Sequence, residues 1–192
     1  MKKVLMVVLL LTFIAFTLIS GTLAYYTISI DNLASGSVVA KNFVFVEDGE
    51  DSFGDNVKIA PGESVTWQFS VTNYDENTKR ISETDMDLEF TLVLSGADGK
   101  QKIIPLQLTV TDGNDNPVIV RDLEGNQLDP ITGNVTQAIF TDTLPLSTEK
   151  QTKTYNIKID WPFNGQNDTQ YAGAGGTYLK VIATAKQAEP QS

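Results

Sequence analysis

Alternation of apolar and polar side chains at every second residue is the feature that most restricts how this chain folds. It is clearest in SVTWQFSVTN, residues 64–73, where the apolar positions are Val65, Trp67, Phe69 and Val71. An extended strand places successive side chains on opposite faces, whereas a helix would scatter this pattern around its axis. The same alternation recurs in MDLEFTLVLS, residues 86–95, and in YNIKIDW, residues 155–161. All three segments are predicted to be half-buried strands.

Further strands and the turns between them indicate the fold class. Strands are also expected at 38–46, 103–111, 118–121, 136–144 and 178–185, separated by turns rich in Gly, Asn, Asp and Pro. Residues 73–84 are polar and are expected to form a loop or one helical turn. The chain is therefore predicted to be all-β, with a single jelly-roll-like β-sandwich over residues 37–186 and a frayed tail over 187–192. Trp67 and Trp161 fall in the inward register and are expected in its core.

The N-terminus has the order of a secretory signal. Lys2 and Lys3 precede a long apolar run, and the small residues Thr22 and Ala24 occupy the positions that a signal peptidase recognises. We expect residues 1–24 to be a signal peptide, cut between Ala24 and Tyr25 during export. The protein would then be secreted to the extracellular matrix or cell surface. The alternative is a retained membrane anchor, because about twenty apolar residues suffice to cross a bilayer.

Residues 25–36 are predicted to form a terminal strand and a joint. In YYTISI, the side chains of Tyr26, Ile28 and Ile30 share one apolar face, and Ser35 and Gly36 follow as a flexible hinge. A terminal strand on such a joint can pair within its own sheet or reach the sheet of a neighbouring molecule. The residues alone leave both arrangements open.

Composition argues against several classes of function. The net charge of −10 disfavours binding to nucleic acid. The chain has no histidine and no cysteine, so it lacks the HExxH motif and the usual bases and thiols of hydrolases. Acidic residues alternate along one strand face opposite the core side, where a solvated surface explains them better than two-carboxylate catalysis; they are Glu83, Asp85, Asp87 and Glu89. We expect the protein not to be an enzyme.

One turn has the composition of a calcium loop. DGNDNP places the oxygen donors Asp112, Asn114 and Asn116 at alternate positions, which suits Ca²⁺. A second acidic stretch covers residues 47–55. The EF-hand pattern fails at Pro117, where a glycine is needed. Ordinary polar turns are the alternative, and no other cofactor is expected.

Both ends of the domain resemble a family of exported fibre proteins. The N-terminal match is GTLAYYT with ASGS, followed by the turn at Pro61, Gly62 and Glu63 and a strand ending near Asn73; the C-terminal match is YAGAGGTYLKVIATAKQ. These segments resemble the TasA and camelysin (CalY) family of biofilm matrix proteins. The chain departs from that family at Tyr26, where the family commonly has Phe, and in lacking an acidic residue soon after.

The resemblance implies a jelly-roll subunit whose N-terminal strand, with Tyr26, Ile28 and Ile30, inserts into the sheet of the next subunit. The expected partner is the chain itself in a head-to-tail homopolymer, together with an accessory or anchoring matrix protein and a signal peptidase during export. Camelysin is described as a metalloprotease, an activity for which this chain has no histidine. The alternative function is a monomeric or membrane-anchored adhesion or carbohydrate-binding module that uses a surface aromatic such as Tyr74.

Overall fold

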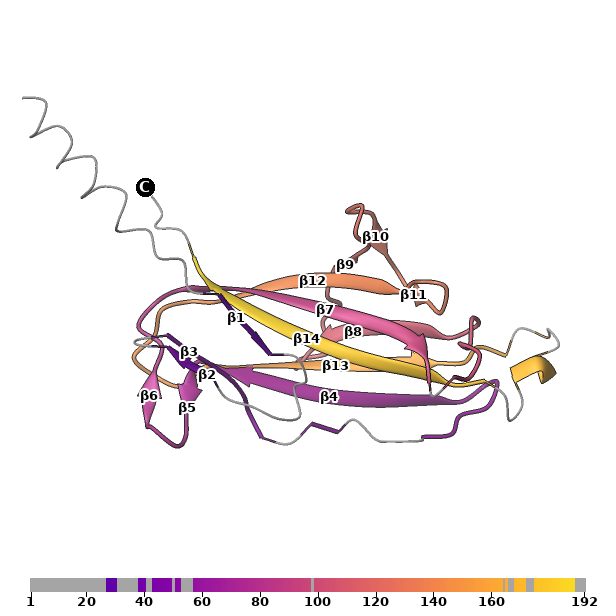
Figure 1. The fold of residues 1–192 in the computed structure, drawn as a ribbon, viewed down its shortest axis with the longest axis horizontal. Helices are drawn as coiled ribbons and strands as arrows, with labels where there is room; N and C mark the ends of the chain where they lie inside the picture. Colours follow the sequence, from indigo (N-terminus) through magenta and orange to yellow (C-terminus); the bar gives the residue numbers. More distant parts are fainter. Residues whose placement is uncertain are drawn as a thin grey trace, which may run out of the picture.

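The structure is a computed structural model that describes residues 27–30, 38–40, 43–49, 51–52, 57–97, 99–163, 165, 168–171 and 175–188. It is an all-β sandwich of two layers (Figure 1). The first sheet has the strand order β1 (Thr27–Ile30), β14 (Thr177–Gln187), β7 (Met86–Gly96), β12 (Gln137–Leu144), β9 (Val120–Arg121) and β10 (Gln127–Leu128). The second has the order β11 (Ile131–Thr132), β8 (Gln107–Asp112), β13 (Thr152–Asp160), β4 (Ser64–Thr72), β3 (Phe43–Glu47) and β2 (Val38–Ala40).

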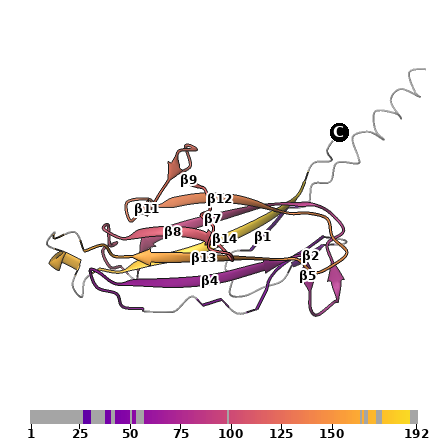
Figure 2. The same cartoon turned by 180° about the vertical axis from the view of Figure 1, so that it is seen from behind.

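The strands pair in a nested order, which makes the sandwich jelly-roll-like. The first strand of the chain, β1, pairs with the last, β14. Inside that pair, β4 pairs with β13, β7 pairs with β12, and β8 pairs with β11, all antiparallel. The chain is thus a long folded-back ribbon that is wound into two sheets. Figure 2 shows the two layers from behind, with β13 and β4 of the second sheet beneath β12 and β7 of the first.

An aromatic cluster fills the centre of the space between the sheets. The Phe90 ring stacks on the Phe140 ring at 4.7 Å between centroids, and the Tyr155 ring lies 4.7 Å from the Phe90 ring and 5.2 Å from the Phe140 ring. Phe69 completes the cluster at 5.3 Å from Tyr155. These rings come from β7 and β12 of the first sheet and from β13 and β4 of the second. The cluster therefore ties the two sheets together, because tilted and offset ring pairs add to the stabilisation from burial.

The alternation seen in the sequence matches burial along the longest strands. In β7 the even-numbered residues from Met86 to Leu94 are buried, and their odd-numbered neighbours are exposed or half-buried. The predicted strands at 64–73, 86–95, 136–144, 155–161 and 178–185 are confirmed within a few residues. Trp161 is buried in the core. Trp67 is half-buried and packs against the core cluster.

Four details differ from the sequence-based expectations. The strand expected at 38–46 is a hairpin of β2 and β3, with Val38 opposite Phe45. The strand expected at 103–111 begins only at Gln107, because the chain turns at Ile104 and Pro105. Residues 73–84 contain a small hairpin of β5 (Tyr74–Asp75) and β6 (Arg80–Ile81) rather than a loop or helical turn.

The fourth difference is at the C-terminus, where Gln187 is the last residue of β14 and not the start of the tail. The Ala188 N–H donates to the Asp85 carbonyl at 2.9 Å, which extends the order by one further residue. A single 3₁₀ turn, η1 (Thr169–Tyr171), is the only helical element among the residues described. The expected signal peptide, its cleavage site at Ala24 and Tyr25, Tyr26, and the hinge at Ser35 and Gly36 lie outside these residues. Within them, no helix has the length and apolar character needed to cross a bilayer.

Phe90→Ala tests the importance of the aromatic cluster. Phe90 is fully buried, so the change removes a ring that touches both sheets and leaves a cavity. We expect a loss of about 3–5 kcal/mol in the free energy of unfolding, measured by chemical denaturation. Leu123→Ala, at a side chain that is 66% exposed, is the control and should cost less than about 0.5 kcal/mol. Equal losses in the two variants would contradict this assignment of the core.

Candidate functional site

The N-terminal strand occupies one edge of the first sheet. β1 pairs with the C-terminal part of β14, with Ile28 opposite Ala185 and Ile30 opposite Ala183. Ala183 and Ala185 are fully buried. Figure 1 shows β1 as a short strand alongside the much longer β14. Four residues of β1 cover only part of the eleven-residue strand β14.

The rest of β14 has no described strand on that side. The Gly176 carbonyl and the Ala188 N–H both bond toward β7. Because an antiparallel strand alternates the direction of its backbone groups, the N–H and C=O groups of Leu179, Val181, Ala183 and Ala185 point away from β7. β1 pairs with the last two of these. We call these four residues the β14 edge.

The other side of the first sheet has an edge at β12. The Leu94 N–H donates to the Thr136 carbonyl at 2.9 Å, so the even-numbered residues of β12 bond to β7 and the odd-numbered ones point outward. Ile139 pairs with Arg121 of β9. Thr141 and Thr143 are exposed and have no described strand beside them. We call the outward backbone groups of Ile139, Thr141 and Thr143 the β12 edge.

Asp142 occupies a position of β12 where the alternating pattern predicts an apolar side chain. Ala138, Phe140 and Leu144 are buried, and Asp142 shares their register. Its Oδ2 accepts a hydrogen bond from the Tyr155 hydroxyl at 2.7 Å, and its Oδ1 accepts one from Lys153 Nζ at 3.2 Å. Asp142 Oδ1 also accepts the Thr143 N–H at 2.7 Å. Burial and then the neighbouring Asp142 raise the pKa of Tyr155, so the phenol stays protonated and donates to Asp142.

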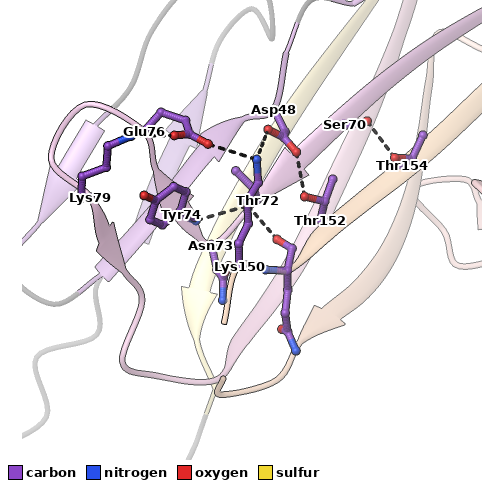
Figure 3. A network of polar contacts seen from close by, with 11 residues as sticks. Asp48, Ser70, Thr72, Asn73, Tyr74, Glu76, Lys79, Lys150, Thr152 and Thr154 are labelled. Carbon is purple, nitrogen blue, oxygen red and sulfur yellow. Dashed lines mark hydrogen bonds and ion pairs between the residues drawn. The ribbon is translucent and has the colours of Figure 1, made fainter. Parts of the chain in front are cut away.

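A second polar network ties the β5–β6 hairpin to the second sheet (Figure 3). Lys150 Nζ lies 2.7 Å from Asp48 Oδ1 and 3.4 Å from Glu76 Oε1, so one ammonium group bridges two segments. Thr152 also donates to Asp48, at 2.7 Å. Burial would raise the pKa of Asp48, but the hydrogen bonds from Lys150 and Thr152 outweigh burial and hold the pKa below its ordinary value. These contacts hold the hairpin against the second sheet.

Tyr74, the surface aromatic that the sequence suggested for sugar binding, belongs to the same network. Its ring lies 5.9 Å from the ammonium groups of both Lys79 and Lys150. These distances fit cation–π contacts. The ring is thus engaged by the protein's own lysines.

Glu47 ends β3 and lies opposite Val71, a core residue of β4. Directly opposite residues share a face, so Glu47 faces the first sheet across the end of the sandwich. Burial, and then the charge of Asp51, raises the pKa of Glu47 to about 7. The carboxyl is therefore half-protonated near neutral pH.

The proposed calcium residues do not converge as oxygen ligands. The Asp112 carboxylate accepts the N–H groups of Asn114 at 2.8 Å and Asn116 at 2.9 Å, and the Asn116 side chain turns its Nδ2, not its oxygen, toward Asp112. Asp122 and Asn126 repeat the arrangement in the next turn. The hydrogen bonds from Asn116 hold the pKa of Asp112 below its ordinary value. No cluster of three or more metal-ligating carboxylates occurs in the described part of the chain.

Four acidic residues that the sequence analysis assigned to a solvated strand face, and not to catalysis, are exposed. Glu83, Asp85, Asp87 and Glu89 all lie on the surface, while Met86, Leu88 and Phe90 between them are buried. Sequence reasoning missed Asp142, although its charge in an apolar register was a visible signal.

Comparisons with known proteins identify no family and give only remote structural matches. No family model matches the chain, and no curated protein matches it. Among solved structures, a chain from the structure of infectious bursal disease virus (Gx strain) is 11% identical in sequence to this protein, with a TM-score of 0.34. The match covers 88% of this chain and 34% of that chain. A mannan-recognising carbohydrate-binding module has 15% identity and a TM-score of 0.30, with 86% and 99% covered.

A third structure, the enzymatically active domain of tailspike protein 4 of bacteriophage CBA120, has 8% identity and a TM-score of 0.27, with 83% of this chain and 19% of that chain covered. The chain thus spans about a third of the viral protein and a fifth of the tailspike. TM-scores this low carry no argument about function. The resemblance to the TasA and camelysin family therefore stays a prediction.

Glu47→Gln should make stability less dependent on pH. The folded pKa of about 7 lies above the ordinary value of 4.5, so the wild type loses stability as the pH rises through this window. Gln cannot ionise, so we expect a higher melting temperature than wild type at pH 8 and no such gain at pH 4. Thermal melts at both pH values measure this, with Glu89→Gln as the control that removes the same charge from an exposed position. A gain that is equal at both pH values would contradict the burial argument.

Chelation tests the calcium hypothesis directly. Because the Asp112 oxygens already accept hydrogen bonds from their own loop, we expect the melting temperature to be the same with excess EDTA and with added Ca²⁺. A rise in melting temperature with Ca²⁺ that Asp112→Ala abolishes would establish a calcium site here.

Proposed function

We propose that the protein is a secreted structural subunit that polymerises into extracellular filaments, in a biofilm matrix or on a cell surface, by inserting its N-terminal strand into a neighbouring subunit. The observation that carries the proposal is the position of β1. It is four residues long, lies at a sheet edge, and pairs with β14 and no other described strand. In such an assembly β1 would be the strand that one subunit donates, and the β14 edge would be the surface of the next subunit that accepts it.

The nested pairing makes β1 the strand most easily exchanged. The β1–β14 pair is the outermost of the four pairs, and each of the other three closes inside it. Withdrawing β1 therefore leaves those pairs intact. It does uncover the backbone groups of Ala183 and Ala185 on the β14 edge, which then require another strand. An identical β1 from a second copy restores the same contacts, as in domain swapping.

The spacing of the chain permits the exchange. Seven residues, 31–37, separate β1 from β2. A segment of that length spans at most about 25 Å, enough to pass between adjacent small domains. The joint includes Ser35 and Gly36, the predicted hinge. The same strand then fits either its own β14 edge or that of a neighbour.

Exchange of one strand per subunit produces a linear assembly. Each subunit offers one β1 and one β14 edge, and these are different surfaces. A contact between two different surfaces continues from subunit to subunit unless the rotation closes a ring. The signal-like N-terminus, the acidic composition and the residues shared with the TasA and camelysin family support an extracellular site for this assembly. An accessory or anchoring matrix protein would be a further partner.

The test changes Ile28 and Ile30 together to Asp. The two positions lie opposite buried Ala183 and Ala185, so charges there should prevent insertion into a neighbour while leaving the inner strand pairs folded. We expect the exported wild type to form filaments in negative-stain electron microscopy and the variant to remain dispersed, with a loss of at least tenfold in filament length.

The matched control changes the exposed apolar residues Ile119 and Leu123 to Asp. This variant carries the same added charge at side chains that are 58% and 66% exposed, far from β1 in the strand order. It should form filaments like wild type. Filaments of normal length from Ile28→Asp/Ile30→Asp would refute the proposal. A second check compares chains that start at Tyr25 and at Ser37, of which only the longer should polymerise.

A further inference from the structure

The two edges of the first sheet differ in their chemistry. We propose that Asp142, bridged to Tyr155 and Lys153, closes the β12 edge against a strand from a second copy of the chain, so that the sheet accepts a strand at β14 alone. The inference rests on the proposed function only for strand acceptance at β14; the strand kept away from β12 is an edge strand of the second copy and need not be β1. Its argument comes from the donors, charges and packing of the two edges.

The β12 edge has few free backbone donors. Ile139 pairs with Arg121 of β9. The Thr143 N–H is already bonded to Asp142 Oδ1 at 2.7 Å. The next residue in the outward register is Pro145, which has no N–H. Of the three residues that define this edge, Thr141 alone has an outward N–H for which no partner is described. A strand needs a continuous row of such groups, so the edge is a poor template.

The Asp142 bridge makes opening this edge costly. Its carboxylate holds three partners at once: the Tyr155 hydroxyl, the Lys153 ammonium group and the Thr143 N–H. The side chains of Asp142 and Lys153 are 30% and 37% exposed, so they keep part of their hydration. A strand laid along β12 would compete for the Thr143 N–H and would remove water from this ion pair. Desolvating a charge pair opposes association even when the pair remains intact.

Tyr155 fixes the carboxylate in position. Its ring is held in the aromatic cluster against Phe90 and Phe140, and its hydroxyl points out of the cluster to Asp142. An inward-pointing charge on an edge strand is a known protection against edge-to-edge pairing. Here the charge is anchored by a buried ring of the opposite sheet, so it cannot rotate away without breaking that hydrogen bond.

The β14 edge has the opposite character. Its core-facing side chains are all apolar and buried: Leu179, Val181, Ala183 and Ala185. No proline interrupts β14. β1 already pairs with half of this edge, which demonstrates that it accepts a strand. One open and one closed edge predict filaments that neither branch nor thicken sideways through the first sheet.

The test replaces the bridge with apolar side chains: Asp142→Leu, Lys153→Met and Tyr155→Phe together. Changing all three avoids leaving a buried charge or hydroxyl without a partner, since well-packed apolar replacements of such groups are often neutral for stability. The changes are made in the full chain carrying Ile28→Asp/Ile30→Asp, so the readout is independent of the N-terminal strand. We expect sedimentation velocity to show at least a twofold increase in mass over the parent, from monomer to dimer and larger species.

Asp87→Leu in the same background is the matched control. Asp87 lies opposite Thr143 on β7 but is exposed on the outer face of the sheet, so the change makes the same substitution without touching the edge. This control should sediment like the parent. A triple variant that is folded by circular dichroism and has the parent's mass would overturn the inference, whether or not β1 drives filaments.

A single substitution tests the same inference if the triple variant does not fold. Asp142→Asn keeps an oxygen for the Tyr155 hydroxyl and removes the charge, and its neutral amide no longer forms the ion pair with Lys153. We expect faster hydrogen exchange of the Thr143 amide and self-association at lower protein concentration than the parent. An unchanged Thr143 exchange rate together with an unchanged mass would also overturn the inference.

Discussion

The packing of Tyr155 against the stacked rings of Phe90 and Phe140 is the interaction on which the rest of the structure depends. These rings come from both sheets and lie within 5.2 Å of one another between centroids, so they set how the sheets face each other. The same tyrosine carries its hydroxyl to Asp142 at the sheet edge. The contact that holds the core together therefore also positions the charge that distinguishes one edge of the first sheet from the other.

Nested strand pairing connects this core to the proposed assembly. Three inner pairs enclose the aromatic cluster, and the outermost pair, β1 with β14, adds only four residues of ladder. The first strand of such a fold has all the other nested pairs inside it, so none of them depends on it. Polymerisation by exchange of that strand would use the outermost pair of the fold without disturbing its core.

Much of the fold was predictable from particular residues, and the misses have physical causes. Alternation in 64–73 and 86–95 predicted β4 and β7, because burial of one sheet face dictates that pattern. It failed at 38–46, where β3 is buried on both faces and shows no alternation, and where the polar residues Lys41 and Asn42 between the two apolar runs were overlooked as a strand boundary. The calcium hypothesis rested on residue types and awaits the chelation test; in the fold, the Asn116 amide turns its nitrogen toward Asp112. The terminal strand was predicted, but not its pairing with β14.

The sequence by itself determined the long alternating strands, which of their side chains face the core, and that histidine or cysteine chemistry is absent, because these follow from local periodicity and composition. Only the tertiary structure decided which strands pair, where the edges lie, and that Asp142 meets Tyr155 and Lys153. Pairing joins residues as distant as Thr27 and Lys186. Many strands share the same alternation, so the choice among partners is made by packing of the whole sandwich, which no local pattern encodes.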